Sequence, residues 1–162
     1  MTSPPRKFLG ISVRTPAFAL TLVCALGILA IQPAQAQILR VIHTFTGGGD
    51  GSYPKAGLTV DAAGNFYGTA FGGGIVSGGC AFYGCGTVFK LKHRGSGWIL
   101  TPLYSFTGGN DGANPYGRVA IAQDGTLYGT TYSGGGSGCM GYGCGTVFRL
   151  TPSQSAPKSA LV

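Results

Sequence analysis

Residues 80–91 read CAFYGCGTVFKL, and residues 139–150 read CMGYGCGTVFRL. Two copies of one segment indicate two copies of one structural unit. Other blocks return in the same order: FTGG at residues 45–48 recurs at residues 106–109, and GNFYGT at residues 64–69 recurs as GTLYGT at residues 125–130. We therefore read the chain as a tandem repeat, in which each position of the first copy has an equivalent in the second.

The first 36 residues are predicted to be a secretory signal peptide. A basic leader precedes an apolar run at residues 17–31, and a small-x-small cleavage site, Ala34-Gln35-Ala36, follows the run just before Gln37. The apolar run is shorter than the roughly 20 residues of a membrane-spanning helix. We expect a secreted chain, periplasmic or extracellular, that meets the membrane only through this leader before cleavage.

The mature chain is predicted to be all-β. Short runs rich in Val, Ile, Thr, Phe and Tyr are separated by clusters of Gly, Asp and Asn, and no segment keeps a helical period over three turns. Gly64 and Gly125 stand where hairpin turns need a positive φ. Strands are predicted at residues 38–45, 57–61, 65–71 and 86–92 of the first copy, and at residues 99–106, 118–122, 126–132 and 145–151 of the second.

Tandem four-stranded antiparallel meanders are the pattern of β-propeller blades. We assign residues 37–98 to the first blade, residues 99–152 to the second, and residues 153–162 to a disordered tail. Two blades make an incomplete propeller, since closed propellers typically have four to eight. The alternatives are a ring of several copies joined head to tail, a fragment of a longer array, or a compact sandwich of the two units.

The phase of the repeat predicts a strand without a sheet in the first copy and a sheet without an outer strand in the second. If residues 57–61 and 118–122 are the innermost strands, residues 99–106 complete the first sheet as its outer strand. Residues 38–45 then form an outer strand without a sheet of their own, and the second sheet lacks an outer strand. Two unpaired edges would make a solitary chain prone to aggregation.

The chain resembles a known bacterial repeat family. LYSFTGGNDGANP at residues 103–115, DGTLYGTT at residues 124–131 and CGTVFRL at residues 144–150 closely resemble the choice-of-anchor tandem repeat of GloVer-containing proteins. The resemblance covers nearly all of the mature chain. It implies an exported, propeller-like repeat protein, usually with more repeats and often with a C-terminal anchoring signal, of which we see none in this tail. It supplies no catalytic residues.

Four cysteines remain after cleavage, in two pairs that are each separated by four residues. In an exported protein, an even count at a repeated spacing favours disulfides. We predict the local pairs Cys80–Cys85 and Cys139–Cys144, although four cysteines allow three connectivities. The alternative is a four-cysteine zinc site, for which the two pairs would have to meet across the repeats.

The acidic residues predict turns rather than chemistry. Asp50 and Asp111 lie at equivalent positions of glycine-rich loops, where a calcium site is the functional interpretation and an Asx-type turn the structural one. One carboxylate per loop favours the turn, so we predict no metal and no cofactor. No paired carboxylates or Gly-x-Ser-x-Gly elbow occur, and His43 is not repeated, so we predict no enzymatic activity.

Aromatic residues recur at five equivalent positions, and most are expected in the core because a blade buries its strand faces. Tyr83 and Tyr142 differ, because they lie among glycines inside the cysteine loops. We single them out as candidates for stacking on a sugar or gripping a partner protein. The recurring pairs are Phe45 and Phe106, Tyr67 and Tyr128, Phe71 and Tyr132, Tyr83 and Tyr142, and Phe89 and Phe148.

These features predict an exported, non-catalytic β-repeat module that serves as a binding or envelope-associated scaffold. Its expected partners are another copy of itself, head to tail, or an envelope glycan or protein. Removal of the three basic residues of the leader lowers the net charge from +7 to +4, which is too mild to favour nucleic acid. The alternative is a propeller-type polysaccharide lyase or hydrolase whose site forms only on oligomerisation.

Overall fold

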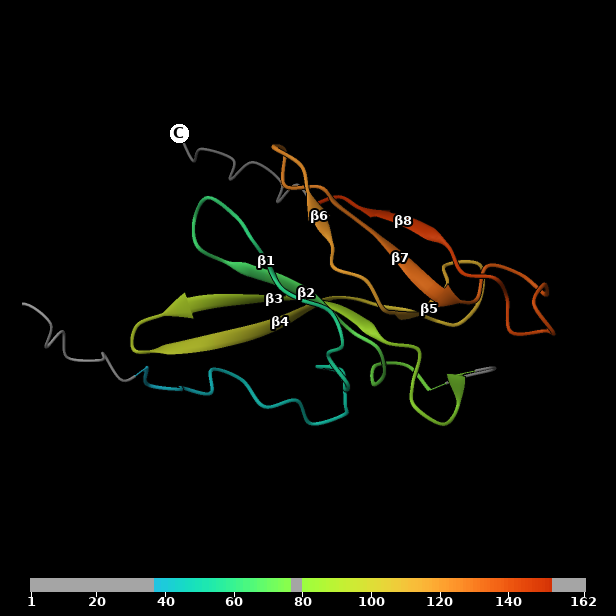
Figure 1. Ribbon diagram of the computed structural model, residues 1–162, viewed down its shortest axis with the longest axis horizontal. Helices are drawn as coiled ribbons and strands as arrows, with labels where there is room; N and C mark the ends of the chain where they lie inside the picture. The colour runs from blue at the N-terminus through green and yellow to red at the C-terminus, as the bar shows by residue number, and fades with distance from the viewer. Residues whose placement is uncertain (1–36, 77–79, 153–162) are drawn as a thin grey trace, which may run out of the picture. The chain divides into compact units, whose positions relative to one another are not determined.

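The computed structural model describes residues 37–76 and 80–152 (Figure 1). Arg40 begins one compact unit, and residues 37–39 belong to a separate unit and have no regular secondary structure. The predicted leader, with Ala34 and Ala36 of its cleavage site, lies outside the described residues, as does the predicted tail at residues 153–162. The described chain is all-β, with two four-stranded antiparallel sheets and no helix.

The first sheet has the order β1-β2-β3-β4 (Figure 1). Its strands are β1 (Thr59–Val60), β2 (Phe66–Ala70), β3 (Thr87–Arg94) and β4 (Gly97–Ser105). β4 pairs with β3 from Ser105 to Gly97, so the strand that opens the second sequence repeat completes the sheet of the first. The phase of the repeat predicts this pairing.

β3 and β4 form a long hairpin with a polar tip. Arg94 pairs with Gly97 across a two-residue turn, and Lys92, His93 and Arg94 are all exposed there. The ring of His93 packs edge-on against Trp98, with the ring centroids 5.1 Å apart. The densest basic cluster of the described chain is therefore a solvated hairpin tip.

The second sheet is built around β7 (Leu127–Ser133), which pairs with three other strands. β5 (Ala113–Pro115) and β6 (Ala120–Ile121) pair with the two halves of β7, and β8 (Val147–Leu150) pairs with β7 as well. The sequence pattern did not predict β5, because Ala-Asn-Pro has neither alternation nor β-branched residues. Among the described strands, β7 is the only partner of β8.

The strand predicted at residues 38–45 is wrong. From residue 37 to residue 58 the chain forms no strand, since no described strand lies alongside residues 38–45 to hydrogen-bond with their backbone. Ile42 and Phe45 instead pack their side chains on the first sheet, and the Phe45 ring lies 5.2 Å from that of Phe89.

Both faces of the first sheet carry apolar clusters. One cluster lies between the sheets and joins Tyr67 and Val88 of the first sheet to Val119 and Leu127 of the second. The other lies on the opposite face and contains Ala70, Phe89 and Leu91, with Ile42 and Phe45 against it. This alternation follows from the two-residue period of a strand, which sends neighbouring side chains to opposite faces.

The two predicted cysteine pairs both lie at disulfide distance. The Cα atoms are 5.1 Å apart in Cys80–Cys85 and 5.3 Å apart in Cys139–Cys144. The pairs belong to separate loops, so the four sulfur atoms are bonded locally and do not form the alternative zinc site. Within the described part of the chain, no helix is both long and apolar enough to cross a membrane.

Candidate functional site

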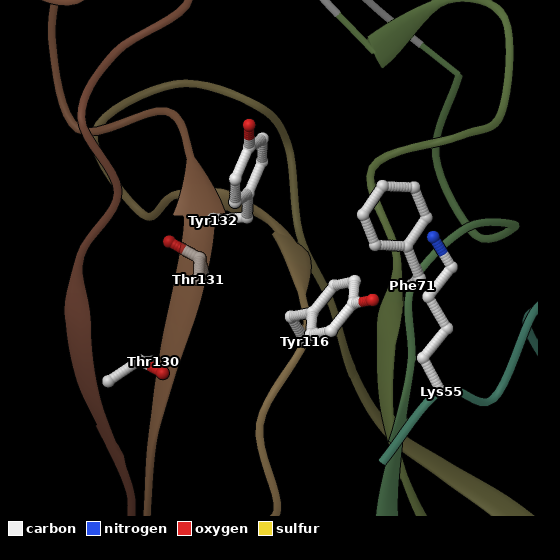
Figure 2. Close-up of a pocket in the computed structure, with 6 residues that line it drawn as sticks. All are labelled: Lys55, Phe71, Tyr116, Thr130, Thr131 and Tyr132. Atoms are coloured by element: carbon white, nitrogen blue, oxygen red, sulfur yellow. The ribbon is translucent and has the colours of Figure 1, made fainter.

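An open cleft of about 630 Å³ lies between the two sheets (Figure 2). Phe71 follows β2, Tyr116 follows β5, and Tyr132 lies on β7, so the three rings come from both sheets. Tyr116 and Tyr132 are 56% and 72% exposed, so their rings are available to a ligand. The complete lining is Lys55, Phe71, Tyr116, Thr130, Thr131 and Tyr132.

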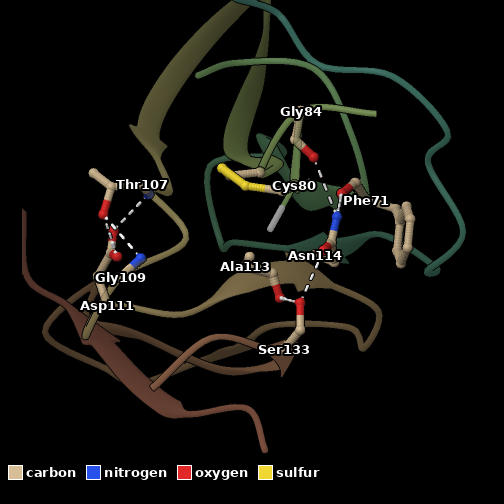
Figure 3. The surroundings of a disulfide bond; sticks show 10 residues. Phe71, Cys80, Gly84, Thr107, Gly109, Asp111, Ala113, Asn114 and Ser133 are labelled. Carbon is tan, nitrogen blue, oxygen red and sulfur yellow. Dashed lines mark hydrogen bonds between the residues drawn. A yellow bond between two sulfur atoms is a disulfide. The ribbon is translucent and has the colours of Figure 1, made fainter. Parts of the chain in front are cut away.

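Asn114 holds the walls of this cleft in place (Figure 3). Its side-chain amide donates to the carbonyl of Phe71 at 2.9 Å and to that of Gly84 at 3.2 Å, and its amide oxygen accepts from Ser133 Oγ at 2.9 Å. The backbone φ of Asn114 is +55°, a left-handed conformation that asparagine tolerates better than most residues. The bond to the Phe71 carbonyl holds Asn114 at the Phe71 backbone. Tyr116 lies two residues after Asn114, and its ring therefore reaches the Phe71 ring.

Among the described residues that line the cleft, Lys55 is the cation beside the aromatic rings. Lys55 Nζ lies 3.8 Å from the centroid of Phe71 and 5.0 Å from that of Tyr116. The Phe71 and Tyr116 rings meet edge to face with centroids 6.0 Å apart. No carboxylate lines the cleft. This arrangement can stack on an apolar ligand face and donate a charged hydrogen bond at its rim.

The carboxylates of Asp50 and Asp111 organise their own loops. Asp111 accepts from Thr107 N at 2.8 Å, from Thr107 Oγ1 at 2.6 Å and from the Tyr104 hydroxyl at 3.0 Å. Asp50 accepts equivalent bonds from Thr46 N at 2.9 Å and Thr46 Oγ1 at 2.6 Å. The described residues contain no group of three or more His, Cys, Asp or Glu side chains that could hold a metal ion.

Hydrogen bonding keeps both of these carboxylates ionised. Burial raises the pKa of Asp111, but the bonds from Thr107 and Tyr104 outweigh it, so the pKa lies below its usual value. The pKa of Asp50 is lowered in the same way, because bonds from Thr46 and His43 outweigh burial. A carboxyl with a lowered pKa is poorly suited to be a general acid.

Tyr83 and Tyr142, the candidates for ligand contact in the cysteine loops, are 60% and 66% exposed. Each lies in its own disulfide loop, and the Tyr83 ring packs against Tyr53 with centroids 5.9 Å apart. No ring contact between Tyr83 and Tyr142 is found among the described residues, so the structure does not join them in one site.

The sequence model of the Gloeobacter/Verrucomicrobia repeat family matches residues 27–161. The chain belongs to this family. The match includes both sheets of this Gloeobacter/Verrucomicrobia repeat protein and all residues of the aromatic cleft. No curated protein and no solved structure matches the chain.

The cleft of this repeat protein does not follow from the sequence pattern, which predicts most of the recurring aromatic residues in the core. Tyr67, Phe89 and Phe106 are buried as expected, but Tyr128 and Tyr132 are 44% and 72% exposed. The repeat contains a signal that could have found the site. Lys55 and Tyr116 both follow a recurring proline, and Phe71 and Tyr132 are also equivalent, so two repeat positions supply four of the lining residues.

Proposed function

We propose that this chain is an exported, non-catalytic binding module of the cell envelope, and that its aromatic cleft takes a saccharide. The observation that carries the proposal is the cleft itself, in which Phe71, Tyr116 and Tyr132 present rings at an open surface beside the Lys55 ammonium. Aromatic rings stack on the apolar faces of ligands that also hydrogen-bond at their edges, as sugars do. A lysine at the rim suits a glycan with acidic substituents.

The location of the acidic residues supports binding over hydrolysis. Glycosidases use two carboxyl groups that flank the scissile bond, one of them held as an acid. Asp61 and Asp124 lie at hairpin turns and accept hydrogen bonds from their own turns, from Asn65 and Thr126 respectively. With Asp50 and Asp111 engaged in their loops, no aspartate contributes to the cleft.

Export is supported by the disulfides. Two local disulfides persist in an oxidising compartment such as the periplasm or the exterior, whereas thiols stay reduced in most cytosols. The predicted leader provides a route to such a compartment.

Affinity electrophoresis in gels that contain cell-wall or acidic polysaccharides tests the binding function. The wild-type chain is expected to be retarded, and the double variant Tyr116→Ala/Tyr132→Ala to lose about tenfold or more in affinity, since each ring contributes about 1 kcal/mol of stacking. Both side chains are exposed, so the fold should survive.

The matched control is Tyr83→Ala/Tyr142→Ala, which removes two equally exposed tyrosines from the disulfide loops and is expected to bind like wild type. Loss of binding in this control alone would move the site to the loops. Migration of wild type unaffected by every glycan would remove the proposed function, and release of new reducing ends or unsaturated products would contradict its non-catalytic part.

A further inference from the structure

Equivalent residues of the two sheets differ in exposure. Val88 on β3 is fully buried, whereas its counterpart Val147 on β8 is 82% exposed. Tyr67 on β2 is 9% exposed and its counterpart Tyr128 on β7 is 44% exposed. The Cys80–Cys85 pair is buried, whereas both members of the Cys139–Cys144 pair are exposed. The same sequence therefore lines a buried face in the first sheet and an open face in the second.

The second sheet is what buries this face of the first. Val88 belongs to the cluster that also contains Phe106, Val119 and Leu127. The equivalents of these three residues are Phe45, Leu58 and Phe66. Phe45 and Phe66 belong to the cluster on the opposite face of the first sheet, and Leu58 lies beside Gly68 with the Phe89 ring of that cluster. The second sheet therefore has an uncovered apolar face. The side chains that would cover such a face, Phe45, Leu58 and Phe66, lie in the first copy of the repeat.

The backbone shows the same mismatch. β3 pairs along its outer edge with β4, but among the described strands β8 has β7 alone (Figure 1). Residues 40–45 are the repeat equivalents of residues 101–106 at the end of β4, and they have no strand partner. The edge of β8 therefore lacks an outer strand, and residues 40–45, the equivalent of an outer strand, pair with no described strand.

Residues 40–46 are already held where such a strand would lie. The Phe45 and Phe89 rings have centroids 5.2 Å apart with an interplanar angle of 65°, and the equivalent Phe106 and Phe148 rings have the same distance and angle. Asp50 holds Thr46 with the same two bonds by which Asp111 holds Thr107. This segment meets the first sheet as the end of β4 meets the second.

We propose that copies of this chain associate head to tail, with residues 40–44 of one copy added as an antiparallel strand to β8 of another. The β3–β4 pairing sets the register: Arg40 falls opposite Arg149 as Thr101 does opposite Lys90. The occupant is a second copy, because the missing strand and the missing cover are both present at the start of this chain. Phe45 and Leu58 of that copy cover Val147 and Tyr128. Strand addition of this kind gains main-chain hydrogen bonds and side-chain burial together.

Only some of the hydrogen bonds that join the two sheets within a chain have an equivalent in the proposed contact between copies. Thr69 Oγ1 donates to the carbonyl of Gly117 across the sheets at 3.1 Å, and the equivalent Thr130 can donate to Ala56 of the second copy. Asn114, however, has Tyr53 as its equivalent, and Tyr53 lacks the amide that bonds the neighbouring loop. We therefore expect association to be weaker than the packing of the two sheets within a chain.

The mass of the exported chain in solution, measured by sedimentation over a range of concentrations, tests the association. Wild type is expected to associate, and Val147→Lys to weaken association by about tenfold or more, because a charge would enter the apolar contact. Val147 is exposed in the single chain, so the fold is kept. Ile99→Lys, on the outer strand β4, is the control and should associate like wild type. A strictly monomeric wild type would overturn the proposal.

Cross-linking tests the register and the identity of the occupant. A copy with Arg40→Cys is mixed with a copy with Arg149→Cys under mild oxidation, and a disulfide-linked dimer is expected. Lys90→Cys/Thr101→Cys is the repeat counterpart within one chain and should link without any increase in mass. If another segment covered β8, mixing would yield no dimer, and the proposal would fail.

A charge reversal at Arg40 is expected to strengthen association, whereas Val147→Lys weakens it. Like charges directly opposite in a sheet are unfavourable, so Arg40→Glu, which faces Arg149 in this register, is expected to strengthen association severalfold. Arg94→Glu makes the same change in net charge at the hairpin tip and should do much less. Equal effects of the two variants would contradict the register. The glycan test can be repeated in the Val147→Lys background at a concentration where the chain is monomeric, so that the cleft variants are compared without association.

Discussion

Asn114 connects the fold to the cleft at the level of a single side chain. It lies on β5 in a left-handed conformation, is 9% exposed, and joins the carbonyls of Phe71 and Gly84 to Ser133. The backbone N–H of Asn114 also donates to the carbonyl of Cys85 at 2.7 Å. One residue of the second sheet therefore ties together the end of β2 and the disulfide loop of the first.

Replacement of Asn114 separates its conformational role from its hydrogen bonds. Asn114→Ala loses both side-chain donors and puts at positive φ a residue that tolerates this conformation less well than asparagine, so the free energy of unfolding should fall by about 2–4 kcal/mol. Asn114→Gly loses the bonds but tolerates the backbone, so its loss should be about 1 kcal/mol smaller. Urea unfolding measures both values.

The neighbour Ser133 provides the control for Asn114. Ser133→Ala removes the bond to Asn114 Oδ1 at 2.9 Å and a long bond to the Ala113 carbonyl at 3.5 Å, so a loss of about 1 kcal/mol is expected. If Asn114→Ala were no more destabilising than Ser133→Ala, the two bonds to Phe71 and Gly84 would not be holding the sheets together.

At the level of elements, turns and loops explain most of what the sequence predicted. Asp61 accepts from the amides of Ala63 and Asn65, which fixes the β1–β2 hairpin, and Gly64 follows with φ of +78°. These contacts span few residues, so the turn is recognisable from the sequence. β5 escaped prediction because a pairing partner far along the chain makes it a strand, rather than the propensity of Ala-Asn-Pro.

The two disulfide loops are alike in sequence and differ in surroundings. Cys80 and Cys85 are buried, and Asn114 bonds their loop, whereas Cys139 and Cys144 are exposed. A reductant reaches an exposed disulfide first. Under limited reduction of the Val147→Lys variant, at a concentration where it is monomeric, we expect Cys139 and Cys144 to be alkylated at least tenfold faster than Cys80 and Cys85.

Peptide mapping by mass spectrometry after timed alkylation measures these rates. The matched comparison is Asn114→Gly combined with Val147→Lys. Loss of the Asn114 side chain should free the Cys80–Cys85 loop and so reduce the difference between the alkylation rates of the two cysteine pairs. Equal rates of reduction for the two loops before that change would show that burial does not protect Cys80 and Cys85. Each loop is short, so loss of either bridge should cost only about 2 kcal/mol.

At the level of the whole molecule, each sheet is stabilised by the neighbour that covers it. Stability in repeat proteins is close to a sum of the units and the contacts between neighbouring units, and a terminal unit with an uncovered apolar face is weaker. Here the second sheet has such a face, with Val147 and Tyr128 open.

This arrangement predicts a stability that depends on concentration. If copies associate only when folded, mass action adds about 1.4 kcal/mol for each tenfold rise in concentration above the dissociation constant. The thermal midpoint of wild type should therefore rise with protein concentration, and that of Val147→Lys should begin to rise only at concentrations about tenfold or more higher. Scanning calorimetry at several concentrations measures the midpoints. A wild-type midpoint that stays constant throughout would contradict the head-to-tail contact.

The sequence alone determined what depends on near neighbours in the chain. The β class, the hairpins at Asp61 and Asp124, and the close cysteine pairs all follow from residues a few positions apart, whose backbone preferences act locally. The tandem copies also indicated that residues 99–106 close the first sheet. Only the tertiary structure decided which copy of an equivalent residue is buried, because Val88 and Val147 have the same local sequence and different neighbours. The contact of Tyr116 with Phe71 was likewise decided by the tertiary structure. It depends on Asn114, whose partners Phe71 and Gly84 lie at least 30 residues earlier in the chain.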